Sequence, residues 1–153
     1  MTEGPLTPHE EQRIREAFEH VPFAHLLKLE LGEMKRGAAT LHLEVRDELR
    51  QNRGVVHGGV IASLVDTAAA FALLTLLEDD QTSTTLDLTI HYLRPLLKGR
   101  ATAQARVLRA GRRIVVITVD VLNETQTVIS TALTSFLKLP GAHSPGSSPG
   151  GVT

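Results

Sequence analysis

The sequence predicts an α+β domain in which a curved antiparallel sheet wraps around one long central helix. Two observations carry this prediction. Residues 58–77 form a densely apolar run with the length of a buried helix, and the segments on either side alternate apolar and polar residues with the period of a strand. A hairpin before the helix and further strands after it favour a layered arrangement in which the sheet covers the helix.

A short amphipathic helix is predicted at the start of the chain, over residues 8–19. Thr7 takes the N-cap position, Pro8 the first helical position, and Glu10 follows three residues after the cap, which is a capping box. The side chains expected to face inward are Ile14, Ala17 and Phe18. Residues 1–20 are therefore assigned to an N-terminal helical segment ahead of the main domain.

The main domain is expected to span residues 21–139. Two antiparallel strands joined near Gly37 are predicted between Lys28 and Arg46 from two sets of alternating apolar residues, Leu27, Leu29 and Leu31, then Leu41, Leu43 and Val45. Four later runs rich in Thr and Val are predicted to form an antiparallel meander of strands over residues 84–93, 99–110, 112–123 and 125–139. Residues 140–153 are rich in Pro, Gly and Ser and are expected to be a disordered tail.

Length and composition narrow the possible functions. The 153 residues suit one domain with one core, and 16 basic against 17 acidic residues leave no positive excess for nucleic acid. The chain has no cysteine for a disulfide, a thiolate nucleophile or a Cys-based zinc site. The start MTEGPLTPHEEQR is too polar for a signal peptide, so a cytoplasmic location is expected.

A membrane span and several kinds of site are also disfavoured. Residues 58–77 are diluted by Gly, Ser and Thr, and a central Asp66 costs about 2.5–3.5 kcal/mol on insertion scales, so a buried helix is expected. The chain carries no Gly-x-Ser-x-Gly elbow, phosphate-binding loop or dinucleotide fingerprint. Metal-ligand spacing is lacking among the histidines His9, His20, His25, His42, His91 and His143. Neither a metal nor a cofactor is expected.

The long helix presents two different faces. The bulky face, which should pack on the sheet, carries Val60, Ile61, Leu64, Val65, Ala68 and Phe71. The opposite face carries mainly small residues, namely Gly59, Ala62, Asp66, Ala69, Ala70 and Leu73. Another backbone could approach this second face closely. Asp66 on it is either a structural acid bonded to a neighbouring group or a catalytic carboxylate facing a polar cleft.

The helix start offers a second catalytic element. The N–H groups of Gly58 and Gly59 have no partner within the helix and can point at an oxyanion. Eight residues separate Gly58 from Asp66 by about 12 Å along the axis, whereas a reacting carbonyl needs both within about 3 Å. Two copies of the helix packed antiparallel about a two-fold axis near Ala62 would bring Gly58 of one chain level with Asp66 of the other. We therefore predict a homodimer with two composite sites.

The string GVVHGGVIASLVDTAAAFAL, followed by LDLTIHYLRP, resembles the hotdog-fold acyl-CoA thioesterases of the phenylacetate-degradation and 4-hydroxybenzoyl-CoA type. The resemblance depends on HGG at a helix start, the acid nine residues after His57, and the strand that follows, and it covers about residues 20–138. It implies the hotdog fold and hydrolysis of an acyl-CoA to the free acid and CoA, with coenzyme A entering only as part of the substrate. It also implies a homotetramer built as a dimer of dimers.

The resemblance assigns roles around the long helix. Asp66 would act as general base or nucleophile on the thioester carbonyl, which the Gly58 amide of the partner subunit would polarise. His57 would hold the helix start by hydrogen bonding. Relatives carry an Asn or Gln six residues before the His that orients water or the carboxylate. Here that residue is Gln51, with Asn52 beside it, and the sequence leaves open which of the two faces the site.

Further candidates lie on the strands. Thr85 matches a hydroxyl that relatives place near the attacking water, with an ordinary strand threonine as the alternative. The candidate substrate contacts, beside Asn52 and Gly59, are Tyr92, Leu93 and Arg94 in the YLRP segment and Gly111, Arg112 and Arg113 in the AGRR turn. Arginine suits the phosphates of coenzyme A by bidentate bonding, and a solvated basic turn is the alternative.

Other readings of the same fold stay open. Aromatic and medium-chain acyl groups fit equally well, and Phe71 could line the pocket for either. A non-catalytic acyl-CoA sensor would need an output module, for which the N-terminal helix is too short. A hotdog hydratase or dehydratase would use a differently placed His with an acid.

Overall fold

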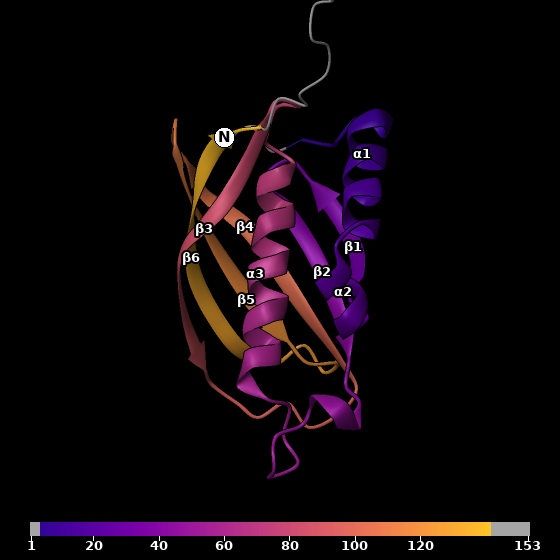
Figure 1. Ribbon diagram of the computed structural model, residues 1–153. Coiled ribbons are helices and arrows are strands. Elements are labelled where there is room, and N and C mark those ends of the chain that lie inside the picture. The colour runs from indigo at the N-terminus through magenta and orange to yellow at the C-terminus, as the bar shows by residue number, and fades with distance from the viewer. Residues whose placement is uncertain (1–3, 142–153) are drawn as a thin grey trace, which may run out of the picture.

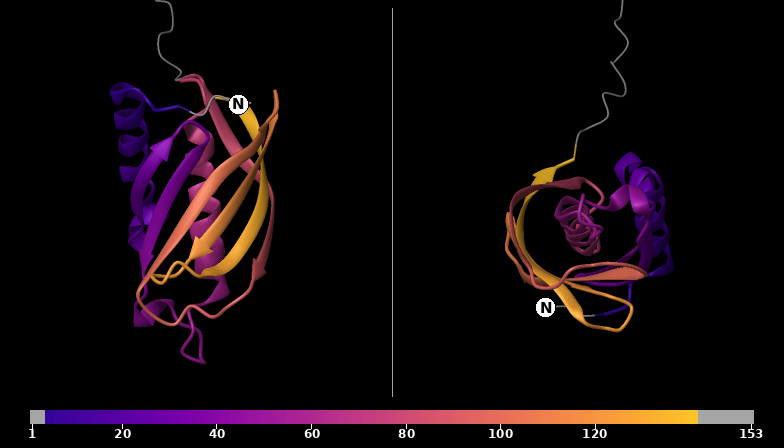
Figure 2. Two further views of the ribbon diagram at one scale, coloured as in Figure 1. Left: turned by 180° about the vertical axis from the view of Figure 1, so that it is seen from behind. Right: turned by 90° about the horizontal axis from the view of Figure 1, so that it is seen from below.

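One sheet of six antiparallel strands curves around the helix α3 (Gly58–Leu74), as Figure 1 shows from the side. The computed structural model describes residues 4–141. Figure 2 includes a view along the axis of α3, in which the strands surround much of the helix and α1 (Pro8–Glu19) and α2 (Pro22–Leu27) lie beside it. The predicted α+β architecture is confirmed.

The strands lie close to their predicted positions. Their bounds are β1 (Glu30–Lys35), β2 (Ala38–Glu44), β3 (Gln81–Tyr92), β4 (Arg100–Ala110), β5 (Ile114–Leu122) and β6 (Val128–Pro140), and a short 3-10 turn η1 (Asp47–Leu49) follows β2. The order in the sheet is β1-β2-β4-β5-β6-β3. The predicted four-strand meander is therefore wrong for β3, which pairs with β6 at the sheet edge instead of with β4. Residues 93–99 are long enough to cross the end of the sheet, so β4 can pair with β2.

Helix α1 begins with the predicted capping box, since Thr7 Oγ1 accepts from the Glu10 amide at 3.2 Å and Glu10 Oε2 accepts from the Thr7 amide at 2.8 Å. Ile14 and Phe18 are buried as expected, but Ala17 is exposed. The Phe18 ring packs edge-on against Phe71 of α3, with ring centroids 5.2 Å apart. Ile14 and Phe18 are four residues apart and share one face of the helix, whereas Ala17 is turned about 100° away from Phe18.

Helix α2 was not predicted from the sequence. Its Pro22 occupies the favoured first turn, and the buried Ala24 and Leu27 face the core. Leu27 therefore belongs to a helix and not to the strand alternation predicted for it. Helix α2 ends at Leu27, and its C-cap residue Lys28 has a left-handed backbone with φ of 54°.

Helix α3 packs closely on the inner face of the sheet because β4 presents small side chains there, namely Ala101, Ala103 and Ala105. The expected bulky face is largely buried. Ala69 and Leu73, placed on the open face by the sequence analysis, are both 0% exposed. The curved sheet covers more of the helix circumference than a flat sheet would.

The ends of the long helix and of the last strand differ from the expectations. α3 ends at Leu74, and the buried hydroxyl of Thr75 accepts from the Gly37 amide at 2.7 Å. β6 extends to Pro140, and the Gly141 amide donates to the Asp80 carbonyl at 2.6 Å, so the predicted tail boundary at 140 is wrong. Residues 142–153, the rest of the predicted tail, lie outside the described residues.

Within the described part of the chain, no helix is long and apolar enough to cross a bilayer.

Candidate active site

The start of α3 is held by its N-cap residue, His57. The Nδ1 atom of this ring accepts from the Gly59 amide at 2.8 Å. The expectation that both glycine amides are free is therefore wrong for Gly59, because its N–H is used to cap the helix. The Gly58 amide has no acceptor among residues 4–141. It remains the available donor at this helix end.

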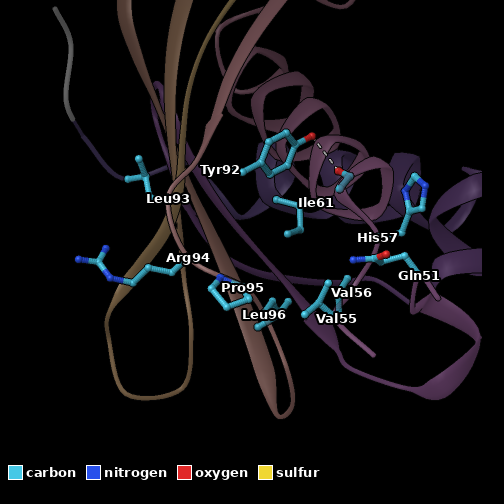
Figure 3. A pocket seen from close by; sticks show the side chains of 11 residues that line it. Gln51, Val55, Val56, His57, Ile61, Tyr92, Leu93, Arg94, Pro95 and Leu96 are labelled. Atoms are coloured by element: carbon cyan, nitrogen blue, oxygen red, sulfur yellow. Dashed lines mark hydrogen bonds between the residues drawn. The ribbon is translucent and has the colours of Figure 1, made fainter. Parts of the chain in front are cut away.

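Tyr92 packs directly on Gly58. Its hydroxyl donates to the Gly58 carbonyl oxygen at 2.9 Å, the bond drawn in Figure 3. A Cβ on residue 58 would lie 3.2 Å from the tyrosine ring, tighter than most real contacts. Glycine at this position thus lets the end of β3 approach the helix start.

A pocket of about 420 Å³ opens beside this contact. One wall comes from the loop before α3 and the other from the segment after β3, and the lining residues are Gln51, Val55, Val56, His57, Gly58, Ile61, Tyr92, Leu93, Arg94, Pro95 and Leu96. Gln51 lines the pocket, whereas Asn52 is exposed in the turn and is not among the lining residues. Five of the lining residues, Val55, Val56, Ile61, Pro95 and Leu96, were missed as site residues. The paired valines before His57 were an available sequence signal for an apolar wall.

Asp66 lies on the face of α3 that the sheet leaves partly open. The Thr85 hydroxyl of β3 donates to its Oδ1 atom at 2.9 Å. Nearby polar side chains on the same face are satisfied within the helix, because Ser63 donates to the Gly59 carbonyl and Thr67 to the Ser63 carbonyl, each at 2.7 Å. The second carboxylate oxygen, Oδ2, has no hydrogen-bond partner within residues 4–141.

A β-bulge aims Thr85 at the helix. The register of β3 with β6 shifts between Thr85 and Asp87, so that Thr85 pairs with the buried Phe136 and Leu88 pairs with the buried Thr134. In a regular strand, successive residues face opposite sides of the sheet. If Thr85 faced α3 in such a strand, Leu88 and Tyr92 would point away from α3. The bulge lets the site hydroxyl and the apolar half of β3 face the same helix, and such bulges are common next to active sites.

The basic AGRR turn does not join this pocket within one chain. Gly111, Arg112 and Arg113 connect β4 to β5 at the sheet end where Gln81 begins β3, whereas Tyr92 ends β3 at the other end. The length of β4 puts about 33 Å between the two ends. Arg94 lines the pocket, but its guanidinium donates to the Val128 carbonyl at 2.7 Å and points away in Figure 3.

The site thus falls into two parts on one helix. Gly58 and Asp66 are both in α3, and the rise per residue separates them by about 12 Å along its axis. The carboxylate and the free amide therefore cannot act on one carbonyl within one chain. Among the described residues, His, Asp and Glu side chains form no group of three that could hold a metal ion.

Known proteins resemble this chain in both sequence and fold. Residues 53–130 match the thioesterase superfamily. The medium/long-chain acyl-CoA thioesterase YigI of Salmonella typhimurium is 33% identical in an alignment of 133 residues that covers 77% of this chain and 86% of the relative. The E. coli PaaI protein from the phenylacetic acid degradation operon is 25% identical with a TM-score of 0.80, covering 87% of this chain and 96% of PaaI. A thioesterase family protein from Silicibacter pomeroyi has a TM-score of 0.82 at 23% identity, covering 86% of this chain and 99% of that one.

Proposed function

The chain belongs to the thioesterase superfamily and is a thioester hydrolase with the hotdog fold, and we propose that its substrate is an acyl-CoA with a medium-chain or aromatic acyl group. The division of the site along α3 is the observation that carries the mechanism. In the proposed mechanism, the Asp66 carboxylate and the free Gly58 amide act on the same thioester carbonyl. Because the two groups lie too far apart within one chain, a second chain must supply one of them.

The proposed dimer forms through β3, which lies at the edge of the sheet. A two-fold axis between two β3 strands pairs them antiparallel and sets the two α3 helices antiparallel as well. Gly58 of the partner subunit then lies level with Asp66. The same rotation brings the partner's AGRR turn to the Tyr92 end of β3, where Arg112 and Arg113 of the partner subunit can bind the phosphates of coenzyme A.

In the proposed reaction Asp66 acts as a general base. Thr85 holds Oδ1, so Oδ2 is free to accept a proton from water as that water attacks the thioester carbonyl. The Gly58 amide of the partner subunit donates to the developing oxyanion, a contribution of about 2.7–4 kcal/mol in comparable sites. The C–S bond breaks and CoA leaves as the thiolate. If Asp66 instead attacks as a nucleophile, CoA leaves first and a mixed anhydride forms; where water then opens it at the Asp66 carbonyl, single turnover in H₂¹⁸O puts the label into Asp66 and leaves the product acid unlabelled.

The acyl group is proposed from the pocket and from a relative. Val55, Val56, Ile61 and Leu96 make the pocket walls mainly apolar, and the relative with 33% identity is named a medium/long-chain acyl-CoA thioesterase. The PaaI protein makes aromatic acyl groups the second choice. Comparing kcat/KM over alkyl and aryl acyl-CoAs separates the two. Phenylacetate degradation as the pathway and a cytoplasmic location stay predictions.

A dimer of dimers is part of the proposal. The outer face of the sheet exposes Ile114 and Leu133, about half of each side chain being accessible, which favours further association through this face. Light scattering of the purified protein measures the oligomeric state.

The decisive test replaces Asp66 with Asn. Asparagine still accepts from Thr85 but cannot take a proton, so thiol release from acyl-CoA should fall about 100-fold or more. Asp120 is a matched control, because it accepts from the Thr131 hydroxyl at 2.7 Å on the outer face of the sheet. Asp120→Asn should leave turnover unchanged. Wild-type turnover in Asp66→Asn contradicts the mechanism, and loss of enoyl-CoA absorbance without thiol release would instead indicate a hydratase.

A further inference from the structure

The two walls of the pocket are far apart in sequence, and few bonds join them. The first wall belongs to residues 51–57 and the second to residues 93–96. The Val56 amide donates to the Leu96 carbonyl at 2.9 Å at the base of the pocket. Farther out, the loop closes on itself, as the Gln51 amide donates to the Val55 carbonyl at 2.8 Å and the Gly54 amide to the Gln51 carbonyl at 3.1 Å.

This turn has little packing of its own. Asn52, Arg53 and Gly54 are exposed, and a Cβ built on Gly54 meets no atom within 4 Å. Its position must therefore come from a few polar contacts. Gln51, the candidate site residue, is at its base.

Arg50 supplies those contacts. One guanidinium nitrogen donates to the Gly54 carbonyl at 2.5 Å and to the Leu97 carbonyl at 2.7 Å, so a single cation joins the tip of the first wall to the residue directly after the second wall. The Nε atom donates to Asp47 at 3.1 Å, which fixes the guanidinium from behind. The side chain is 26% exposed and is not among the residues that line the pocket.

We infer that Arg50 is a positioning residue that holds the two pocket walls at the separation the acyl-CoA requires. The inference rests on the proposed function. A hydrogen bond from a charged donor shifts an equilibrium by about tenfold or more, so loss of both carbonyl contacts frees the turn at 51–55. The Gly58 amide is less affected, because His57 and Tyr92 hold the helix start independently. Substrate binding should therefore suffer more than turnover.

The test compares Arg50→Met with Arg46→Met. Arg46 also donates to two backbone carbonyls, those of Leu27 and Leu26, both at 3.0 Å, but lines no part of this pocket. Arg50→Met is expected to raise KM about tenfold while kcat stays within about threefold. Arg46→Met should leave KM unchanged. Arg50→Lys keeps a cation with several donors and is expected to recover most of the lost KM.

Two further measurements do not depend on turnover. The Kd of a non-hydrolysable acyl-CoA thioether should rise about tenfold in Arg50→Met alone, and hydrogen exchange at the Gln51 and Gly54 amides should accelerate in that variant while α3 stays protected. If wild type binds the thioether but releases no thiol from an acyl-CoA, the proposed function fails. The role of Arg50 is still tested, because neither the Kd nor the exchange rate depends on turnover. Equal loss in Arg46→Met, or an unchanged Kd and exchange rate in Arg50→Met, overturns the role of Arg50.

Discussion

At the residue scale, the sequence located Asp66 but not its surroundings. Its place among small residues on an apolar helix made it a candidate catalytic carboxylate, with a structural acid as the alternative. Thr85 was proposed only by resemblance, and its hydroxyl lies 2.9 Å from Oδ1. The choice between Gln51 and Asn52 needed the turn at 51–55, because adjacent residues in a loop have no periodicity that assigns them a side.

Removing the Thr85 hydroxyl tests its role. Thr85→Val deletes one hydrogen bond to a charged acceptor, which contributes about 1.5 kcal/mol, so kcat should fall about tenfold. Thr85→Ser should stay near wild type. Thr131→Val removes the matching bond to Asp120 on the outer face and serves as the control. Equal rates in Thr85→Val and Thr131→Val contradict a role for Thr85 in the reaction.

Among the elements, α1 was the easiest to predict, because its capping box is a local signal. The capping box does not show how α1 attaches to the rest of the domain. Glu10 Oε1 accepts from Arg36 at 2.6 Å, which ties the helix start to the turn between β1 and β2. The Thr7 backbone amide, and then Arg36, lower the pKa of Glu10 from 4.5 to about 2.

This shift predicts a pH dependence of stability. A carboxylate whose pKa is lower in the folded state stabilises the fold above its unfolded pKa, and the contribution is lost as the proton binds. The contribution of Glu10 should be complete above pH 4.5 and disappear as the pH falls to about 2. Thermal unfolding of wild type and Glu10→Gln should differ most near neutral pH and converge in this window. A constant difference down to the acid limit would contradict the assignment.

The bulge in β3 is the element that sequence analysis was least able to find. Strict alternation through the run of residues 84–93 would send Thr85 and Tyr92 to opposite faces. The register shift puts both toward α3. A single extra residue leaves no clear mark in a pattern of Thr, Leu and Ile, so its position depends on the pairing with β6.

At the scale of the whole molecule, the proposed site needs two chains. A chain with Asp66→Asn and a chain with Gly58→Pro should each form inactive homodimers. Proline suits the first helical position and lacks the N–H. His57, the residue before it, has the extended backbone conformation that residues preceding a proline favour. In a mixed dimer one of the two composite sites keeps both groups.

Random mixing should therefore restore about a quarter of wild-type activity, since about half the dimers are mixed and each has one intact site. Gly58→Ala is the control, because it adds the same Cβ beside Tyr92 and keeps the amide. No recovery from a mixture in which mixed dimers are demonstrated would contradict the shared site.

The sequence by itself determined the six strands, the helices α1 and α3, the cap of α1, the bulky buried face of α3 and the presence of one acid among small residues. These features follow from local chemistry and from periods of 3.6 and 2 residues. Only the tertiary structure decided that β3 pairs with β6, that Thr85 and Tyr92 share a face, and that Arg50 joins two loops. Such contacts link residues far apart in the chain, and their geometry depends on how the whole sheet closes around α3.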